Sequence, residues 1–182
     1  MDKNMLLNRY AAGERNFSGV TLHQANLRDI DLSGANLSGV DLSGADLNRA
    51  NLSGCDLSRA NLTNADLNGA NLSGANLSET NLIGADMVHV NLEASNLHRA
   101  DLRSASLVLA NLARANLSES ELSGTNFSGA NLFHADFSTT NLYEAEITGA
   151  DLTGAIITEE EMSTEKANTG LSHKWVTWAG GR

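Results

Sequence analysis

The chain has 182 residues, which fits a single domain, and its formal net charge is −10 from 22 acidic and 12 basic residues. This excess of acid argues against direct nucleic-acid binding, because phosphate contacts require clustered lysine and arginine. No apolar run reaches the roughly 18 residues of a membrane span. Arg9 and Tyr10 also interrupt the N-terminal apolar residues too early for a secretory signal. We therefore expect a cytoplasmic protein that makes no contact with a membrane.

Residues 1–14 are predicted to form an N-terminal helical cap. Asp2 or Asn4 can cap the helix N-terminus, Leu6 and Tyr10 belong to its apolar face, and a glycine follows the helix. A stack of repeats needs such a cap, because its terminal repeat exposes unpaired backbone and bare apolar side chains.

Residues 15–157 keep one five-residue rhythm. Every fifth residue from Phe17 to Ile157 is apolar, and 23 of these 29 residues are leucine. We call this the central position. The small position lies two residues earlier and holds alanine in 18 cases, and the Asx position between them holds Asn or Asp in 24 cases.

This period fits neither an α-helix, which repeats near 3.6 residues, nor a β-strand, which repeats at 2. A fixed short repeat is typical of a solenoid, in which each unit buries its apolar face by stacking on its neighbours. The two-residue spacing places the central and small positions on one side of an extended segment, so both fill the interior. The chain has no proline, which agrees with coils joined by a ladder of backbone hydrogen bonds.

With its consensus Ala-Asp/Asn-Leu-Ser-Gly, seen in residues 35–39, the segment resembles the pentapeptide-repeat family. Residues 10–17 are similar to cyanobacterial members of that family. The resemblance implies an all-β fold, a right-handed quadrilateral parallel β-helix with four repeats per coil. The 29 repeats would then make about seven coils.

Residues 158–182 leave the pattern and are predicted to form a C-terminal helical cap and tail. Thr158 is a suitable N-cap, with Glu161 at the spacing of a capping box. Further along, Trp175, Val176 and Trp178 form an apolar stretch. Two alternatives stay open for this stretch. It folds back over the last coil, or it contacts a second copy in an end-to-end homodimer, an arrangement that the resemblance to the family also implies.

No catalytic, cofactor-binding or metal site is predicted. An interior filled with leucine and alanine leaves no space for a ligand, and the five histidines have no partner at a metal-ligand spacing. Cys55, the single cysteine, occupies a small position, so we expect a buried and inert thiol. We therefore expect a protein that is not an enzyme and that acts through its exterior.

The acidic residues have two interpretations. The resemblance implies the first, since some pentapeptide-repeat proteins imitate duplex DNA and bind type II topoisomerases such as gyrase. With four repeats per coil, one side would stack Asp46, Asp66 and Asp86 at successive levels, and the preceding side would hold Asp41, Asp101 and Glu121. The second interpretation is structural, because 11 of the 16 acidic residues between 17 and 157 occupy the Asx position. That position favours Asn or Asp for local backbone hydrogen bonds.

We therefore expect a non-enzymatic scaffold for protein–protein interaction, with a partner that the sequence does not identify. The resemblance makes regulation one option, since one cyanobacterial relative modulates heterocyst differentiation through a protein partner. DNA mimicry directed at a type II topoisomerase is the alternative.

Overall fold

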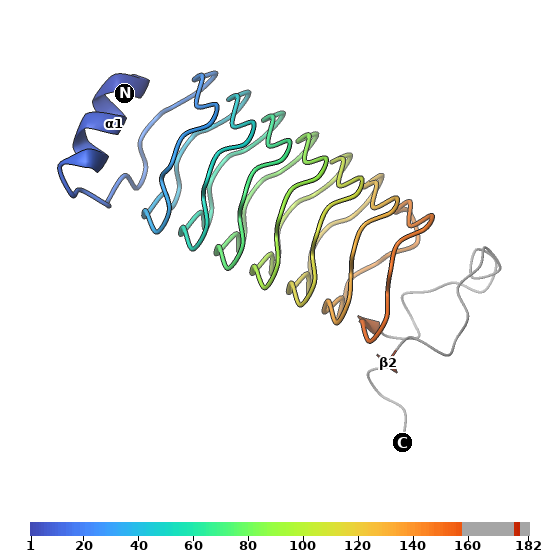
Figure 1. Cartoon of the computed structure of the whole chain (residues 1–182). Coiled ribbons are helices and arrows are strands. Elements are labelled where there is room, and N and C mark those ends of the chain that lie inside the picture. The colour runs from blue at the N-terminus through green and yellow to red at the C-terminus, as the bar shows by residue number, and fades with distance from the viewer. Residues whose placement is uncertain (158–176, 179–182) are drawn as a thin grey trace.

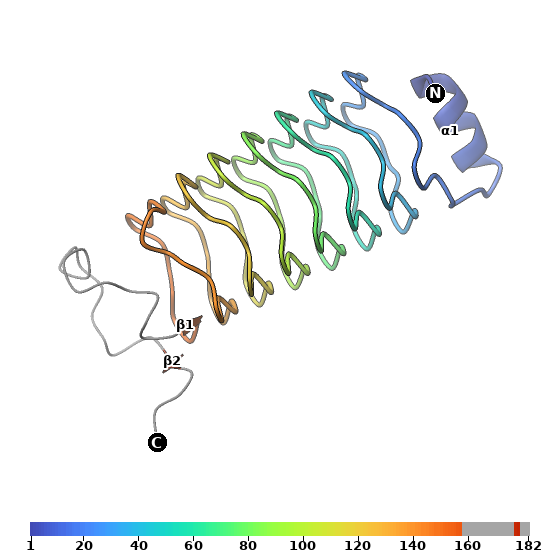
Figure 2. The ribbon, with the colours of Figure 1, turned by 180° about the vertical axis from the view of Figure 1, so that it is seen from behind.

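The computed structural model describes residues 1–157 and 177–178 (Figure 1). These residues comprise the helix α1 (Lys3–Ala11), a stack of coils, and two short strands, β1 (Ile156–Ile157) and β2 (Thr177–Trp178). The coils build a rod with α1 at one end and the two strands at the other (Figures 1 and 2).

Each coil contains 20 residues, because the parallel bridges between coils join residues that are 20 apart. Four five-residue repeats therefore make one turn of the rod, which confirms the predicted right-handed quadrilateral β-helix. The Asx positions line up in four columns, and each column marks one face of the rod. Face 1 begins at Asn16, face 2 at Thr21, face 3 at Asn26 and face 4 at Asp31, and each continues every 20 residues.

Backbone hydrogen bonds join neighbouring coils along the regular part of the rod, as around Leu47. Leu47 N–H donates to the Asp66 carbonyl at 2.7 Å, and Arg49 N–H donates to the Asn68 carbonyl at 2.9 Å. The corner between two faces is a turn, in which Ala50 N–H donates back to the Leu47 carbonyl at 2.9 Å. Arg49, the third residue of this turn, has a φ of 56°, as a type II turn requires. The corner position thus forces a left-handed conformation on whichever residue occupies it.

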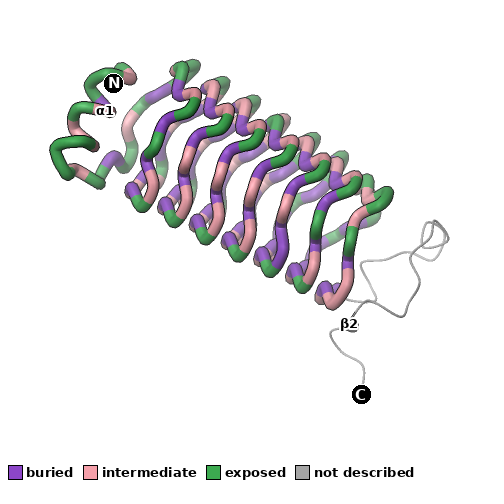
Figure 3. The backbone as a smooth tube through the Cα atoms, viewed as in Figure 1, coloured by how far each residue is buried: buried purple, intermediate pink, exposed green. Residues whose placement is uncertain are grey.

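The interior is filled by the central and small positions, as the sequence predicts (Figure 3). From Phe17 to Leu142, no central residue is more than 4% exposed. Inward hydroxyl groups donate to backbone carbonyls, as Thr80 Oγ1 does to Leu57 at 2.7 Å. Within the described residues, no buried side-chain nitrogen or oxygen lacks a hydrogen-bond partner. The rod therefore uses its interior for packing and presents its remaining chemistry outside.

Helix α1 lies across the N-terminal end of the rod. Asp2 caps it by accepting a hydrogen bond from Met5 N–H at 2.8 Å, and Leu6 is completely buried. Arg15, which occupies the first small position, does not enter the interior. Its guanidinium lies 3.8 Å from the centre of the Tyr10 ring.

The first coil has no preceding coil to donate to its carbonyl groups, and the N-terminal segment supplies donors instead. The Met1 ammonium donates to the Thr21 carbonyl at 2.9 Å, and the Tyr10 hydroxyl donates to the Ser33 carbonyl at 2.9 Å. The segment therefore satisfies backbone groups at the edge of the ladder as well as covering apolar side chains.

The last coil is less regular, although the sequence rhythm continues through it. Gly124 N–H donates to the Glu144 carbonyl at 3.0 Å, one residue later than at equivalent positions. Among residues 1–157, the face 2 bridges end at Glu121, so Asn141 does not extend this column. Ile147 is only half-buried.

Strands β1 and β2 pair in parallel, with Ile156 opposite Thr177 and Ile157 opposite Trp178. Residues 177–178 therefore add one step to the ladder at the C-terminal end of the rod. The predicted helix starting at Thr158, together with Trp175 and Val176, lies outside the described residues.

Candidate functional site

The Asx position caps its own turn, whichever of its two residue types it holds. Asn36 Oδ1 accepts a hydrogen bond from Ser38 N–H at 3.0 Å, and Asp41 Oδ1 accepts one from Ser43 N–H at 3.1 Å. Asn and Asp are therefore equivalent in this local role. An acidic residue at this position is explained by the fold alone unless another contact distinguishes it.

Asparagine adds a second contact that aspartate cannot make, because its amide donates along the column. On face 4, five asparagines each donate from Nδ2 to the Oδ1 of the Asx residue one coil earlier, at 3.0 to 3.4 Å: Asn51, Asn71, Asn91, Asn111 and Asn131. An ionised carboxylate only accepts hydrogen bonds. Consecutive aspartates therefore interrupt such a ladder and leave a column of negative charge.

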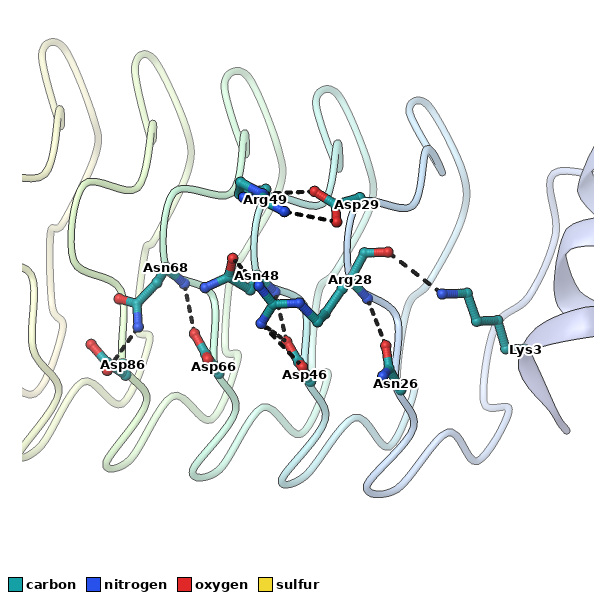
Figure 4. A network of polar contacts seen from close by, with 10 residues as sticks. All are labelled: Lys3, Asn26, Arg28, Asp29, Asp46, Asn48, Arg49, Asp66, Asn68 and Asp86. Atoms are coloured by element: carbon teal, nitrogen blue, oxygen red, sulfur yellow. Dashed lines mark hydrogen bonds and ion pairs between the residues drawn. The ribbon is translucent and has the colours of Figure 1, made fainter.

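Face 3 has that arrangement (Figure 4). Asp46, Asp66 and Asp86 occupy successive levels, as the bridges Asp46↔Asp66 and Asp66↔Asp86 show. Arg28 on the same face forms an ion pair with Asp46 at 3.3 Å. Among residues 1–157, no cationic group forms an ion pair with Asp66 or Asp86. The uncompensated charge of this column is therefore concentrated at the third and fourth coils.

Asn68, which contacts Asp86 in Figure 4, takes over the capping role of that aspartate. Its Oδ1 accepts a hydrogen bond from Val88 N–H at 2.7 Å, the donor that Asp86 would hold in a regular repeat. Its Nδ2 donates to Asp86 Oδ2 at 2.8 Å. The exposed carboxylate of Asp86 is thus not needed for its own turn.

The acidic residues of face 2 are less concentrated. Asn61 and Asn81 occupy the two levels between Asp41 and Asp101, so only Asp101 and Glu121 are direct neighbours. Arg103 donates from Nε to Asp101 Oδ1 at 2.9 Å and holds the pKa of that carboxyl below its ordinary value.

His23, Asp41 and Ser43 also meet on face 2. Ser43 Oγ donates to Asp41 Oδ1 at 2.7 Å and lies 2.7 Å from His23 Nδ1. The serine therefore stands between the other two groups, whereas a nucleophilic triad places the histidine between serine and carboxylate. These contacts therefore have a structural role, and they do not activate Ser43 as a nucleophile.

Burial raises the pKa of the Cys55 thiol to about 11, and its Sγ donates to the Leu32 carbonyl at 3.0 Å. Within the described part of the chain, no three His, Cys, Asp or Glu side chains are grouped so that they could hold a metal ion. The helix in residues 1–157 is also too short and too polar to cross a bilayer.

Leu109 is an exposed residue that the sequence analysis did not single out. It lies at a corner next to face 3, and 53% of its surface is accessible to solvent. The signal was present in the sequence, because this leucine occupies the corner position, two residues after the central Leu107, where glycine is the commonest residue.

The model of the family described as pentapeptide repeats matches residues 16–54, 55–93, 95–132 and 120–158, in eight copies. Among solved structures, trypsin-treated QnrB1, a plasmid-mediated fluoroquinolone resistance protein, has a TM-score of 0.65 at 19% identity and covers 92% of this chain and 91% of its own. HetL, a pentapeptide-repeat protein involved in heterocyst differentiation regulation from the cyanobacterium Nostoc sp. strain PCC 7120, is 31% identical, with 86% and 97% of the two chains covered and a TM-score of 0.27. No curated protein matches the chain.

Proposed function

Because the chain belongs to the pentapeptide-repeat family, we propose that it is a cytoplasmic, non-enzymatic scaffold that binds another protein through its outer faces. The observation that supports this proposal is that the interior of the rod is filled by side chains. The chain's own leucine, alanine and hydroxyl side chains fill it, and the buried hydroxyls already have partners. The side chains that remain for recognition therefore lie on the faces and corners. Such a rigid surface could bind a regulatory protein.

Affinity capture from the native cell tests the scaffold. The full chain carries a tag, the lysate is treated with nuclease, and bound proteins are identified by mass spectrometry. We expect one protein to be enriched over the tag alone, with and without nuclease. Enrichment that depends on nucleic acid, or none at all, would contradict a protein-binding scaffold.

A second candidate function, DNA mimicry directed at a type II topoisomerase, is favoured by one specific observation. Asp46, Asp66 and Asp86 stack on consecutive levels of face 3. Strand spacing separates these levels by about 4.8 Å, so their carboxylates form a short, regular anionic row that a phosphate-binding groove could accept.

The triple variant Asp46→Asn, Asp66→Asn and Asp86→Asn tests DNA mimicry. We expect the parent chain to inhibit supercoiling by gyrase and this variant to lose the inhibition. The matched control changes Asp31, Asp56 and Asp136 to Asn, which alters the net charge equally on other faces. Equal effects of the two triple variants, or no inhibition by the parent, would rule out a specific role of the row.

A further inference from the structure

Leu109 lies at a corner where neither the backbone conformation nor burial favours a leucine. Its φ is 57°, a conformation that crowds the Cβ of any residue except glycine. Its Cδ2 leans over Gly129 and lies 2.8 Å from the point where a Cβ of that glycine would be. This contact covers part of the side chain, yet 53% of the residue stays exposed. A glycine at residue 109 would fit the turn better and expose less apolar surface.

Two valines extend the apolar surface from Leu109 onto face 3. Val88 and Val108 are half-buried, and they occupy the same outward position in adjacent coils. The coils are held together here by a hydrogen bond from His89 N–H to the Val108 carbonyl at 3.0 Å. Val88, Val108 and Leu109 thus form one group, which we call the Leu109 cluster.

Uncompensated negative charge borders the Leu109 cluster. Asp86 precedes Val88 by two residues on the same face, and its turn is capped by Asn68. The arginines beside this face are already engaged, since Arg28 pairs with Asp46 at 3.3 Å and Arg49 pairs with Asp29 at 2.7 Å. Asp86 is an exposed carboxylate without an ion-pair partner in residues 1–157, and it lies opposite Ser106, which precedes Val108 and Leu109 in the next coil.

We infer that Asp66, Asp86 and the Leu109 cluster form the docking site for a protein segment that presents a lysine or arginine beside an apolar side chain. Charge complementarity selects this occupant, because the cation would pair with Asp86 while the apolar side chain covers Leu109. A second copy that docked through the same residues would bring carboxylates against carboxylates, and nucleic acid would be repelled. The inference rests on the proposed scaffold function and assigns it to one part of one face.

A synthetic peptide of alternating lysine and leucine is the probe. NMR titration of the isotope-labelled full chain should shift the amide signals of Val88, Val108 and Leu109. The double variant Asp86→Asn/Leu109→Gly should bind the peptide at least tenfold more weakly without a lower melting temperature, since glycine suits the corner. The matched control Asp56→Asn/Ala94→Gly changes one aspartate on face 1 and one corner residue between faces 4 and 1, and it should bind like the parent.

The docking site is wrong if the peptide shifts signals on all faces alike, if both double variants weaken binding equally, or if no binding occurs below about 1 mM. A peptide with glutamate in place of lysine should bind at least tenfold more weakly, and equal binding would also overturn the inference. Capture from the native cell separates this failure from that of the scaffold. If the parent and Asp86→Asn/Leu109→Gly capture a partner equally well, the docking site is wrong but the scaffold function stands.

Discussion

At the scale of single residues, the Asx position has two separate roles. It caps a turn of the backbone, and it sets the charge of the surface. Asn36 and Asp41 cap their turns in the same way, so the backbone does not choose between them. The choice changes the surface, because Asn amides link coils into a neutral ladder whereas Asp carboxylates collect charge. Asp86 goes further, since its cap comes from Asn68 and its carboxylate is exposed.

Asp41→Asn is expected to make the protein less sensitive to acid. Hydrogen bonds from Ser43 hold the pKa of the Asp41 carboxyl below its ordinary value. Such a group adds stability above the unfolded pKa, about 3.9, and this stability is lost as the pH falls through the lower folded pKa. The amide does not titrate, so the melting temperature of the variant should fall less on acidification from about pH 5 to about pH 2.

Thermal melts followed by circular dichroism across this pH range measure the effect. Ser43→Ala serves as a second probe, because it removes the hydroxyl donor and should also reduce the acid sensitivity. Melting curves of parent and Asp41→Asn that shift in parallel with pH would contradict the assignment.

The Cys55 thiol should be unreactive while the chain is folded. With its pKa raised to about 11, its thiolate fraction at pH 8 is far below that of a free thiol. A chromogenic disulfide reagent should therefore react at least about 100-fold more slowly with the folded chain than with the chain unfolded in urea. Fast modification at pH 8 without unfolding would show that the site opens.

At the scale of elements, helix α1 takes the place of a preceding coil at the N-terminal end of the rod. Leu6 is completely buried at the end of the rod, and the Met1 ammonium and the Tyr10 hydroxyl donate to first-coil carbonyls. Without this segment, the edge would offer unpaired acceptors to any other extended chain.

Leu6→Asp is expected to release the cap. A carboxylate in a fully buried, apolar site loses its hydration without a partner, so the helix should detach, at a cost of about 3 kcal/mol or more. The exposed coil edge should then promote association, which sedimentation velocity detects. Met5→Asp is the matched control on the same helix, because Met5 is 51% exposed, and it should remain like the parent.

At the scale of the whole molecule, the rod is a one-dimensional stack in which each coil contacts only its neighbours. Within residues 1–157, bridges join residues 20 apart and link no more distant levels. Stability should therefore be a sum of coil and nearest-neighbour terms.

Deletion of residues 56–75 tests this view, because it removes one whole coil of 20 residues and joins Cys55 to Asn76 in the correct phase. We expect a folded rod with an unchanged shape of the circular dichroism spectrum and a moderately lower melting temperature. Deletion of residues 56–73 is the control, since it breaks the rhythm and should prevent cooperative melting. If both deletions fold equally well, the stack does not depend on phase.

The sequence by itself determined which residues face inward and which cap the turns. These are local properties, since a two-residue spacing sets the sides of an extended segment and an Asx side chain reaches only its own turn. The central residues from Phe17 to Leu142 and the buried Cys55 were predicted correctly for this reason.

Only the tertiary structure decided what lies side by side on the outside. Bridges between residues 20 apart place Asp66 beside Asp86, as the family resemblance implied but the period alone did not. The stacked coils also let Asn68 cap the turn of the next coil and leave Leu109 exposed at a corner. The five-residue period does not contain this information, because the number of repeats per coil depends on how the turns close between distant residues. The irregular coil around Glu144 is likewise not visible in the five-residue period, because the sequence rhythm continues through it.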